Sequence, residues 1–514
     1  MPYRVLVANR GEIAIRIAKT VREMGLTPLG IYTKEDVYSL HRRFMFEDRE
    51  VSSYLDIKDI VDVAVEMGAD AVHPGYGFLS ENPEFAREVL RKGLVFVGPS
   101  PQIIGMAGDK TAAKVYAEKM GIPTLPWTEA SKLEDVVEFA RVHGYPVIIK
   151  AAGGGGGRGS RVVWREKDVE TAFEVARKEA ERAFKDPRLF VEPYIAKAKH
   201  IEVQVIGDGS TVVHLFEREC SIQRKFQKIV EEAPSPSLNP DERGKVHEYA
   251  VALASGLRYV NAGTVEFVFD VDRREFYFME INTRIQVEHP VTEMITGIDI
   301  VKKQIEVALY GVLDLRQSDI TRRGHAIEVR IYAENPLTGE PSPGRITRYV
   351  EPVGPGVRVD TGVTEGSIVT DRYDPLISKL IVWGPDRYVA LRRLEKALSE
   401  YIIEGISTNI KQLKLMIASA EFLNASYTTA FYEKNEAYLK SKLLDEATLH
   451  SVIASALLEF KDEGCKTLLR KTRGLKEILE TPRAEKLKRS AWYYYVVLRG
   501  AIERAKQRKI VKKP

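Results

Sequence analysis

The sequence predicts a multidomain protein of the α/β and α+β classes, with a doubly wound parallel-sheet domain at the N-terminus and a β-rich domain at the C-terminus. Three observations predict it. The chain has 514 residues, which is too long for a single hydrophobic core. Residues 1–110 alternate short apolar runs with helical patterns, as parallel sheets covered by helices do. Residues 326–440 hold short strand patterns among dense Gly and Pro, which indicates β structure.

The first domain, residues 1–110, begins with a strand pattern at once. Its expected elements are a strand at 4–8, an amphipathic helix at 12–24, and strands at 29–33, 71–73 and 95–98. Gly and Pro follow two of these strands, in the segments HPGYG and GPSP. Because open parallel sheets bind ligands at the carboxyl ends of their strands, we expect binding residues there.

The second domain, residues 111–325, is predicted to contain antiparallel sheet. Its expected elements are a strand at 146–150, a helix at 166–185, strands at 189–195 and 200–206, and a hairpin of 264–269 with 276–281. The third domain, 326–440, is predicted to be mostly β with a helix near 386–401. The tail, 441–514, is predicted to be a basic helical extension, with 18 Lys and Arg against 9 Asp and Glu.

Composition excludes several classes of function. A net charge of +4 is small for this length, so we expect no nucleic-acid partner. Two cysteines exclude a disulfide framework and favour a reducing compartment. The sequence has no apolar run that could span a bilayer, and the strand that begins at Tyr3 leaves no room for a signal peptide. We therefore expect a cytoplasmic protein without a membrane partner.

A glycine-rich segment, Gly153 to Gly159, follows the strand pattern VIIK and is interrupted only by Arg158. Glycine lets successive backbone N–H groups converge on phosphate oxygens. A flexible linker is the alternative, but linkers rarely follow such a strand. The segment fits neither GxxxxGK[ST] nor the dinucleotide fingerprint, so we expect a lid over the phosphates of ATP. Lys110 and Lys150 are candidates to reach those phosphates.

Polar and apolar residues alternate between Glu280 and Glu288. The polar members are Glu280, Asn282, Arg284, Gln286 and Glu288. A solvent-facing edge strand is the alternative, but the preceding EFYFMEI looks buried. A straight strand of this length would extend about 26 Å, too far for one reaction centre, so we predict a bend after Asn282. Arg284 would then hold a planar oxyanion, and Glu288 would act as a general base.

A hairpin turn near Arg273 would place Glu266 directly opposite Glu280. Cross-strand partners have Cβ atoms about 4.5–5.5 Å apart. Two carboxylates at that distance repel each other unless a cation lies between them, and the divalent ions that bridge nucleotide phosphates prefer oxygen ligands. We therefore predict a site for Mg²⁺ (or Mn²⁺), with Asn282 as a further ligand.

Four segments of the chain resemble the biotin carboxylase family. They are ANRGEIAIR (8–16), HPGYGFLSEN (73–82), KAAGGGGGRG (150–159) and EINTRIQVEHPVTEMITG (280–297). The match runs from residue 1 to about 440, and its last segment is highly specific. The resemblance implies an ATP-grasp fold with a lid at about 130–195. It also implies an ATP-dependent ligase that carboxylates biotin with bicarbonate through carboxyphosphate.

The resemblance implies a role for each matching residue. The nucleotide would contact Lys110, Lys150, Gly155, Gly156, Gly157, Glu192, Ile195, His200 and Gln223. The metal would be held by Glu266 and Glu280, with Asn282 nearby. Bicarbonate would contact Lys228, Arg284, Gln286 and Val287. Glu288 would be the general base, and Arg330 would stabilise the biotin enolate.

The sequence departs from the family pattern at two positions. Phe226 stands where the family often has His, which puts one polar contact to the nucleotide in doubt. Pro193 replaces a residue whose backbone carbonyl faces adenine, and proline keeps its carbonyl.

None of the nine methionines provides the Met-Lys-Met context of a biotinyl lysine, and too little length is unassigned for a carboxyltransferase. We therefore expect a biotin carboxyl carrier protein and a carboxyltransferase subunit on separate chains. The resemblance also implies a homodimer. The basic tail either docks such partners or is an ordinary helical appendage.

Two other functions stay open, as does the acyl acceptor of the complete enzyme: acetyl-CoA, propionyl-CoA or pyruvate. One function is that of another ATP-grasp ligase, which would join a carboxylate to an amine without biotin. The other is a nucleotide-binding scaffold whose basic tail contacts nucleic acid, which would predict salt-sensitive binding and negligible turnover.

Overall fold

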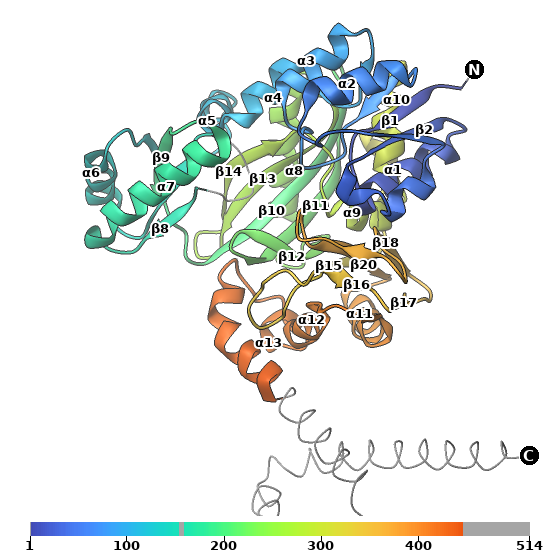
Figure 1. The fold of residues 1–514 in the computed structure, drawn as a ribbon. Coiled ribbons are helices and arrows are strands. Elements are labelled where there is room, and N and C mark those ends of the chain that lie inside the picture. The colour runs from blue at the N-terminus through green and yellow to red at the C-terminus, as the bar shows by residue number, and fades with distance from the viewer. Residues whose placement is uncertain (1, 154–158, 446–514) are drawn as a thin grey trace, which may run out of the picture. The chain divides into compact units, whose positions relative to one another are not determined.

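A parallel sheet of five strands begins the chain, in the order β3-β2-β1-β4-β5 (Figure 1). Its strands are β1 (Arg4–Val7), β2 (Thr27–Tyr32), β3 (Glu47–Glu50), β4 (Ala71–His73) and β5 (Val95–Phe96). The computed structural model describes residues 2–153 and 159–445. The four predicted strands of this sheet are confirmed. The sequence did not predict β3, because its residues EDRE are polar and the strand lies at the sheet edge.

Helices cover both faces of this sheet. Val5 and Val7 pack with α1 (Gly11–Glu23) and α10 (Ile300–Tyr310) on one face. Leu6 packs with α2 (Ile57–Glu66) and α3 (Pro83–Arg91) on the other. Successive residues of a strand point to opposite faces, so one apolar strand supports both layers. The predicted doubly wound arrangement is confirmed, and α4 (Pro101–Gly108) leads out of it.

A small antiparallel sheet, in the order β6-β9-β7-β8, lies in the segment predicted to be a lid. Its strands are β6 (Thr128–Glu129), β7 (Val147–Ala151), β8 (Arg161–Val163) and β9 (Leu189–Pro193), and α6 (Leu133–His143) and α7 (Val169–Phe184) pack on it. The predicted helix at 166–185 therefore begins three residues later, after a short 3-10 turn. Gly155, Gly156 and Gly157, between β7 and β8, lie outside the described residues.

An antiparallel sheet of eight strands, in the order β14-β13-β10-β11-β12-β15-β20-β18, forms the centre of residues 198–384. Its strands are β10 (Ala198–Asp208), β11 (Val212–Arg224), β12 (Gln227–Ala233), β13 (Val260–Asp270), β14 (Glu275–Asn282), β15 (His325–Tyr332), β18 (Val357–Thr361) and β20 (Leu376–Gly384). The predicted hairpin is β13 with β14. The pairing of β12 with β15 carries the sheet across the predicted boundary at residue 325.

The two faces of β10 have different chemistry. Ile201, Val203 and Val205 pack in the apolar layer beneath α5 (Lys110–Lys119) and α8 (Pro240–Gly256). The alternate residues His200 and Glu202 therefore point to the opposite face, where α9 (His289–Thr296) lies. Polar groups buried on that face form the candidate site.

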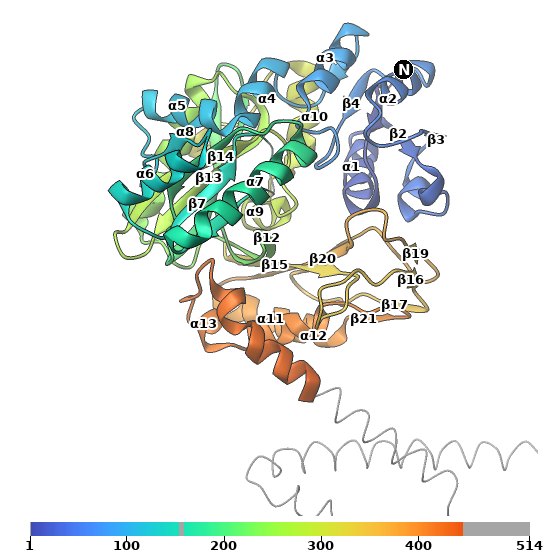
Figure 2. The ribbon, with the colours of Figure 1, turned by 60° about the vertical axis from the view of Figure 1, so that its left-hand side comes forward.

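The C-terminal segment adds helices and two small sheets to β20 (Figure 2). The added elements are β16 (Gly344–Arg345) with β19 (Ile368–Val369), β17 (Arg348–Val350) with β21 (Ile402–Glu404), α11 (Arg387–Glu400), α12 (Ile410–Ile417) and α13 (Ala420–Leu423). The helix predicted near 386–401 is α11. The helices α12 and α13 were not predicted from the sequence. Among the described residues, the structure also has 3-10 segments at Lys34–Asp36, Leu40–Phe44, Glu166–Asp168 and Gln317–Asp319.

The predicted basic extension lies outside the described residues from position 446 onward. Over the part of the chain that is described, none of the helices combines the length and the apolar character that a membrane crossing requires.

Candidate active site

A β-bulge in the β13–β14 hairpin brings the two predicted metal ligands to the same face. Phe267 pairs with Phe278, whereas Glu266 pairs with Glu280, so Met279 is an extra residue in β14. In a strand without the bulge, Met279 would pair with Glu266, and Glu280 would point to the face of Phe267, into the apolar layer. The predicted pairing of Glu266 with Glu280 is confirmed, and the bulge is its cause.

The chain bends where the sequence predicted it. β14 ends at Asn282, and α9 begins at His289. Across the bend, the Arg284 guanidinium donates to Asn282 Oδ1 at 3.1 Å and to Gln286 Oε1 at 3.1 Å. The bend therefore gathers polar groups that a straight strand would have kept apart.

A glutamate from the N-terminal domain also holds Arg284. Glu81 Oε2 accepts a hydrogen bond from Arg284 Nε at 2.9 Å. The sequence predicted no role for Glu81 beyond its place in the segment 73–82. It follows β4, at the sheet edge where ligand-binding residues were expected, and that position was the available signal.

One partly buried ammonium group on β12 binds three carboxylates, which come from two other strands and from the bend. Lys228 Nζ lies 2.5 Å from Glu202 Oε2, 2.8 Å from Glu266 Oε1 and 2.6 Å from Glu288 Oε1. We call these four residues the Lys228 cluster. Sequence reasoning missed Glu202, although it alternates with apolar residues two positions after His200. Arg218 Nε also donates to Glu202 Oε1, at 2.5 Å, so Glu202 has a second cation beside it.

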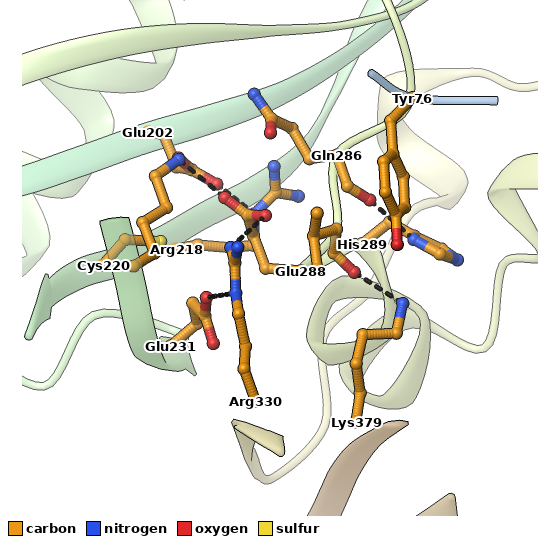
Figure 3. Close-up of polar contacts among 12 residues, drawn as sticks. Tyr76, Glu202, Arg218, Cys220, Glu231, Gln286, Glu288, His289, Arg330 and Lys379 are labelled. Atoms are coloured by element: carbon orange, nitrogen blue, oxygen red, sulfur yellow. Dashed lines mark hydrogen bonds and ion pairs between the residues drawn. The ribbon is translucent and has the colours of Figure 1, made fainter. Parts of the chain in front are cut away.

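Glu288 has the protonation state that a general base requires. Burial would raise the pKa of Glu288, but Lys228 and Arg330 outweigh this effect and hold the pKa below its usual value. The carboxylate is therefore ionised at neutral pH and can accept a proton. Arg330 Nη2 donates to Glu288 Oε2 at 3.0 Å, and Arg330 Nε donates to Glu231 at 2.6 Å (Figure 3).

His200 belongs to the acidic face rather than to an apolar core. Its Nε2 lies 3.1 Å from Glu266 Oε2 and 3.4 Å from Glu202 Oε2. Burial lowers the pKa of His200, but Glu266 raises it more, to about 9. The imidazole is therefore protonated at neutral pH and is suited to contact an anion such as a phosphate.

The donor types around Glu266 fit a hard divalent cation. Glu266 and Glu280 face each other across two strands, and the ligand atoms of His200, Glu202 and Glu266 lie within 4.8 Å of one another. Lys110 Nζ lies 3.1 Å from Glu280 Oε2 and partly neutralises it. Asn282 is buried beside them and shares its Oδ1 with Arg284.

The lid sheet carries a separate group of charges. Lys150 on β7 lies 2.5 Å from Glu192 on β9, and the buried Lys114 on α5 lies 2.7 Å from the same carboxylate. Burial would raise the pKa of Glu192, but the two lysines lower it to about 2. Lys114 was not among the predicted residues. Ile195 follows β9 and is half-buried.

Other predicted residues lie along the edges of the site. Gln223 is buried on β11 and donates to the Cys220 carbonyl at 2.9 Å. The Val287 carbonyl accepts a hydrogen bond from Lys379 Nζ at 2.7 Å. Phe226 lies at the β11–β12 turn with φ of 66°, and its side chain is 42% exposed. Because a phenyl ring has no hydrogen-bonding atom, it cannot supply the polar contact that a histidine could make there.

Comparison with known proteins identifies the family. The models "Biotin carboxylase, N-terminal domain", "Carbamoyl-phosphate synthase L chain, ATP binding domain" and "Biotin carboxylase C-terminal domain" match residues 1–104, 109–316 and 328–434. One pyruvate carboxylase subunit of Methanothermobacter thermautotrophicus is 47% identical over 442 residues, 84% of this chain and 89% of that relative. Biotin carboxylase of Halalkalibacterium halodurans is 46% identical over 83% of this chain and 96% of its own length.

A solved structure extends the similarity to the fold. It is the biotin carboxylase domain dimer of Hydrogenobacter thermophilus 2-oxoglutarate carboxylase in complex with MgADP, ADP and bicarbonate. The TM-score is 0.83 at 43% identity, and the alignment covers 85% of this chain and 99% of that one. The predicted resemblance is therefore confirmed: the chain belongs to the biotin carboxylase family.

Proposed function

We propose that this chain is the biotin carboxylase component of a multi-subunit carboxylase and attaches bicarbonate-derived carbon to biotin at the expense of ATP. The Lys228 cluster carries the proposal. One ammonium, three carboxylates and the guanidinium of Arg330 converge beside Arg284, so the site can hold an anion, accept its proton and stabilise developing negative charge.

The nucleotide phosphates would lie against the cations that line the site. Lys110, Lys150 and the protonated His200 would neutralise phosphate charge during phosphoryl transfer. Glu192, Ile195 and Gln223 would contact the rest of the nucleotide. Glu266, Glu280 and Asn282 would hold Mg²⁺ or Mn²⁺, which when bound supplies further charge neutralisation at the phosphates.

Bicarbonate would occupy the bend beyond β14. Lys228, Arg284, Gln286 and the Val287 backbone are proposed to hold it, because a guanidinium matches the plane of a carbonate oxyanion. Glu288, ionised in this site, would take its proton. The resulting carbonate would attack the γ-phosphate of ATP to give carboxyphosphate and ADP.

Biotin would react with the carbon dioxide released from carboxyphosphate. The phosphate that leaves would take the N1 proton of biotin, and the N1–carbon bond would then form. Arg330, fixed by Glu231 and Glu288, would stabilise the biotin enolate. Exclusion of water by the lid would protect carboxyphosphate from hydrolysis.

The proposal extends to domains, partners and compartment. We propose an N-terminal domain at 1–110, an ATP-grasp domain at 111–325 and a C-terminal domain at 326–440. The Methanothermobacter relative is named as one subunit of its carboxylase, which supports carrier and carboxyltransferase functions on separate chains. The dimer in the Hydrogenobacter structure supports a homodimer. The cytoplasm is the compartment we propose, since the sequence offers no disulfide framework.

ATP hydrolysis with and without bicarbonate and free biotin tests the function. We expect hydrolysis that needs bicarbonate, increases with biotin and yields carboxybiotin. A ligase that joins a carboxylate to an amine would instead hydrolyse ATP with an amine and ignore biotin. That outcome, or hydrolysis indifferent to bicarbonate, would overturn the proposal.

A further inference from the structure

Two glutamates to which the proposed reaction gives no contact with a substrate face each other inside the large sheet. Glu231 on β12 and Glu328 on β15 are direct register partners, and both are fully buried. Partners of this kind have Cβ atoms about 4.5–5.5 Å apart. Two ionised carboxylates in that position would repel each other without water to screen them.

The hydrogen bonds of the two glutamates are unequal. Glu231 Oε1 accepts from Arg330 Nε at 2.6 Å, while its Oε2 has no hydrogen-bond partner among the described residues (Figure 3). Within the same part of the chain, neither carboxyl oxygen of Glu328 has one. Glu231 therefore has a charged partner, and Glu328 has none within hydrogen-bond distance.

The other charged groups on this face already have hydrogen-bond or ion-pair partners. Lys379, directly opposite Arg330 on β20, donates to the Val287 carbonyl and lies 3.2 Å from Glu12. Glu288 adds a further negative charge and already binds Arg330 and Lys228. An ionised carboxylate that is buried without a hydrogen bond is strongly unfavourable, so a proton on Glu328 is the favourable state.

The pKa shifts agree with this geometry. Burial raises the pKa of Glu328 well above its usual value. Burial also raises the pKa of Glu231, to about 7, although Arg330 opposes the increase. A neutral Glu328 removes one of the two negative charges that face each other across β12 and β15.

We propose that Glu231 is a positioning residue that holds the guanidinium of Arg330 in place for biotin, and that Glu328 carries the proton that lets Glu231 stay ionised. The inference rests on the proposed role of Arg330. Glu231 fixes Nε and Glu288 fixes Nη2, so the two carboxylates together determine the plane of the guanidinium. Glu231 itself touches no reacting atom.

Two isosteric variants separate these roles. Glu231→Gln removes the charge that holds Arg330, and we expect biotin carboxylation to fall about tenfold to a hundredfold, as misplaced groups cause. Bicarbonate-dependent ATP hydrolysis without biotin should fall much less than carboxylation, because Lys228 still binds Glu288 in this variant. Glu328→Gln mimics the neutral acid and should leave both activities unchanged.

Each contrary outcome identifies what has failed. Absence of carboxybiotin with the wild-type protein would overturn the proposed function itself. With an active wild type, an undiminished Glu231→Gln, or one that loses both activities equally, would overturn the positioning role. A Glu328→Gln variant as impaired as Glu231→Gln would overturn the proton assignment.

Two further measurements keep the inference testable if Glu231→Gln does not fold. Glu231→Asp keeps the charge but withdraws it from Nε, and it should lower carboxylation more than biotin-independent hydrolysis; an equal loss of both would count against positioning. The infrared difference spectrum of wild type minus Glu328→Gln should contain the carbonyl band of a neutral carboxylic acid. A carboxylate band in its place would overturn the proton assignment.

Discussion

Lys228 Nζ lies 2.6 Å from Glu288 Oε1, although the two residues come from β12 and from the end of the bend before α9. This ion pair joins the large sheet to the chain that follows the β13–β14 hairpin. It also keeps Glu288 ionised inside a buried site. The first two predictions follow from this contact.

Glu288→Gln should lower bicarbonate-dependent turnover at least about tenfold, because general bases typically contribute 10²–10⁴ and glutamine cannot accept the proton. Steady-state ATP hydrolysis at saturating ATP measures the effect. Glu84→Gln, at an exposed position of α3, is the matched control and should behave as wild type. Turnover near the wild-type rate in Glu288→Gln would reject the assigned role.

Lys228→Met should destabilise the protein by about 3–5 kcal/mol, because it leaves buried carboxylates without the ammonium that they share. The free energy of unfolding from denaturant titration measures this change. Lys225→Met, in the exposed turn of the same hairpin, should cost less than about 0.5 kcal/mol. Equal stabilities of the two variants would contradict the importance of the cluster.

Glu280→Gln should weaken the binding of Mn²⁺ at least about tenfold, because it removes one of the two carboxylates that face each other across β13 and β14. Electron paramagnetic resonance of added Mn²⁺ measures the binding. Met279→Leu, at the bulge, keeps both carboxylates and should bind Mn²⁺ normally. Normal binding by Glu280→Gln would show that the facing pair does not build the metal site.

Glu232 should make stability depend on acidic pH. Burial would raise the pKa of Glu232, but hydrogen bonds from His325 and Arg387 lower it to about 2. A lowered folded-state pKa stabilises the protein above the usual value of 4.5, and that contribution disappears as the pH falls from 4.5 toward 2.

Calorimetry at several pH values between 7 and 3 measures this dependence. Glu232→Gln should have a lower Tm at pH 7 and a shallower fall in Tm below pH 4.5, because it has no carboxylate to protonate. Parallel Tm curves for wild type and variant would contradict the lowered pKa.

Local patterns in the sequence predicted much of the fold because they depend on short-range rules. The strands at 4–8 and 71–73 follow from apolar runs, and the β13–β14 pairing follows from the position of its turn. The edge strand β3 was missed because a strand with one open side needs few apolar residues. The roles assigned to the site residues remain predictions.

Motif identity and residue spacing were enough to establish the family, the parallel sheet and the bend after Asn282, because each of these depends on neighbouring residues in the chain. Folding in three dimensions was needed to bring Glu202 beside Lys228, Glu81 beside Arg284, and Glu231 opposite Glu328. These contacts join segments separated by many residues, and they depend on which strands become neighbours in the sheets. Strand order is a property of the packed molecule, so no local pattern contains it.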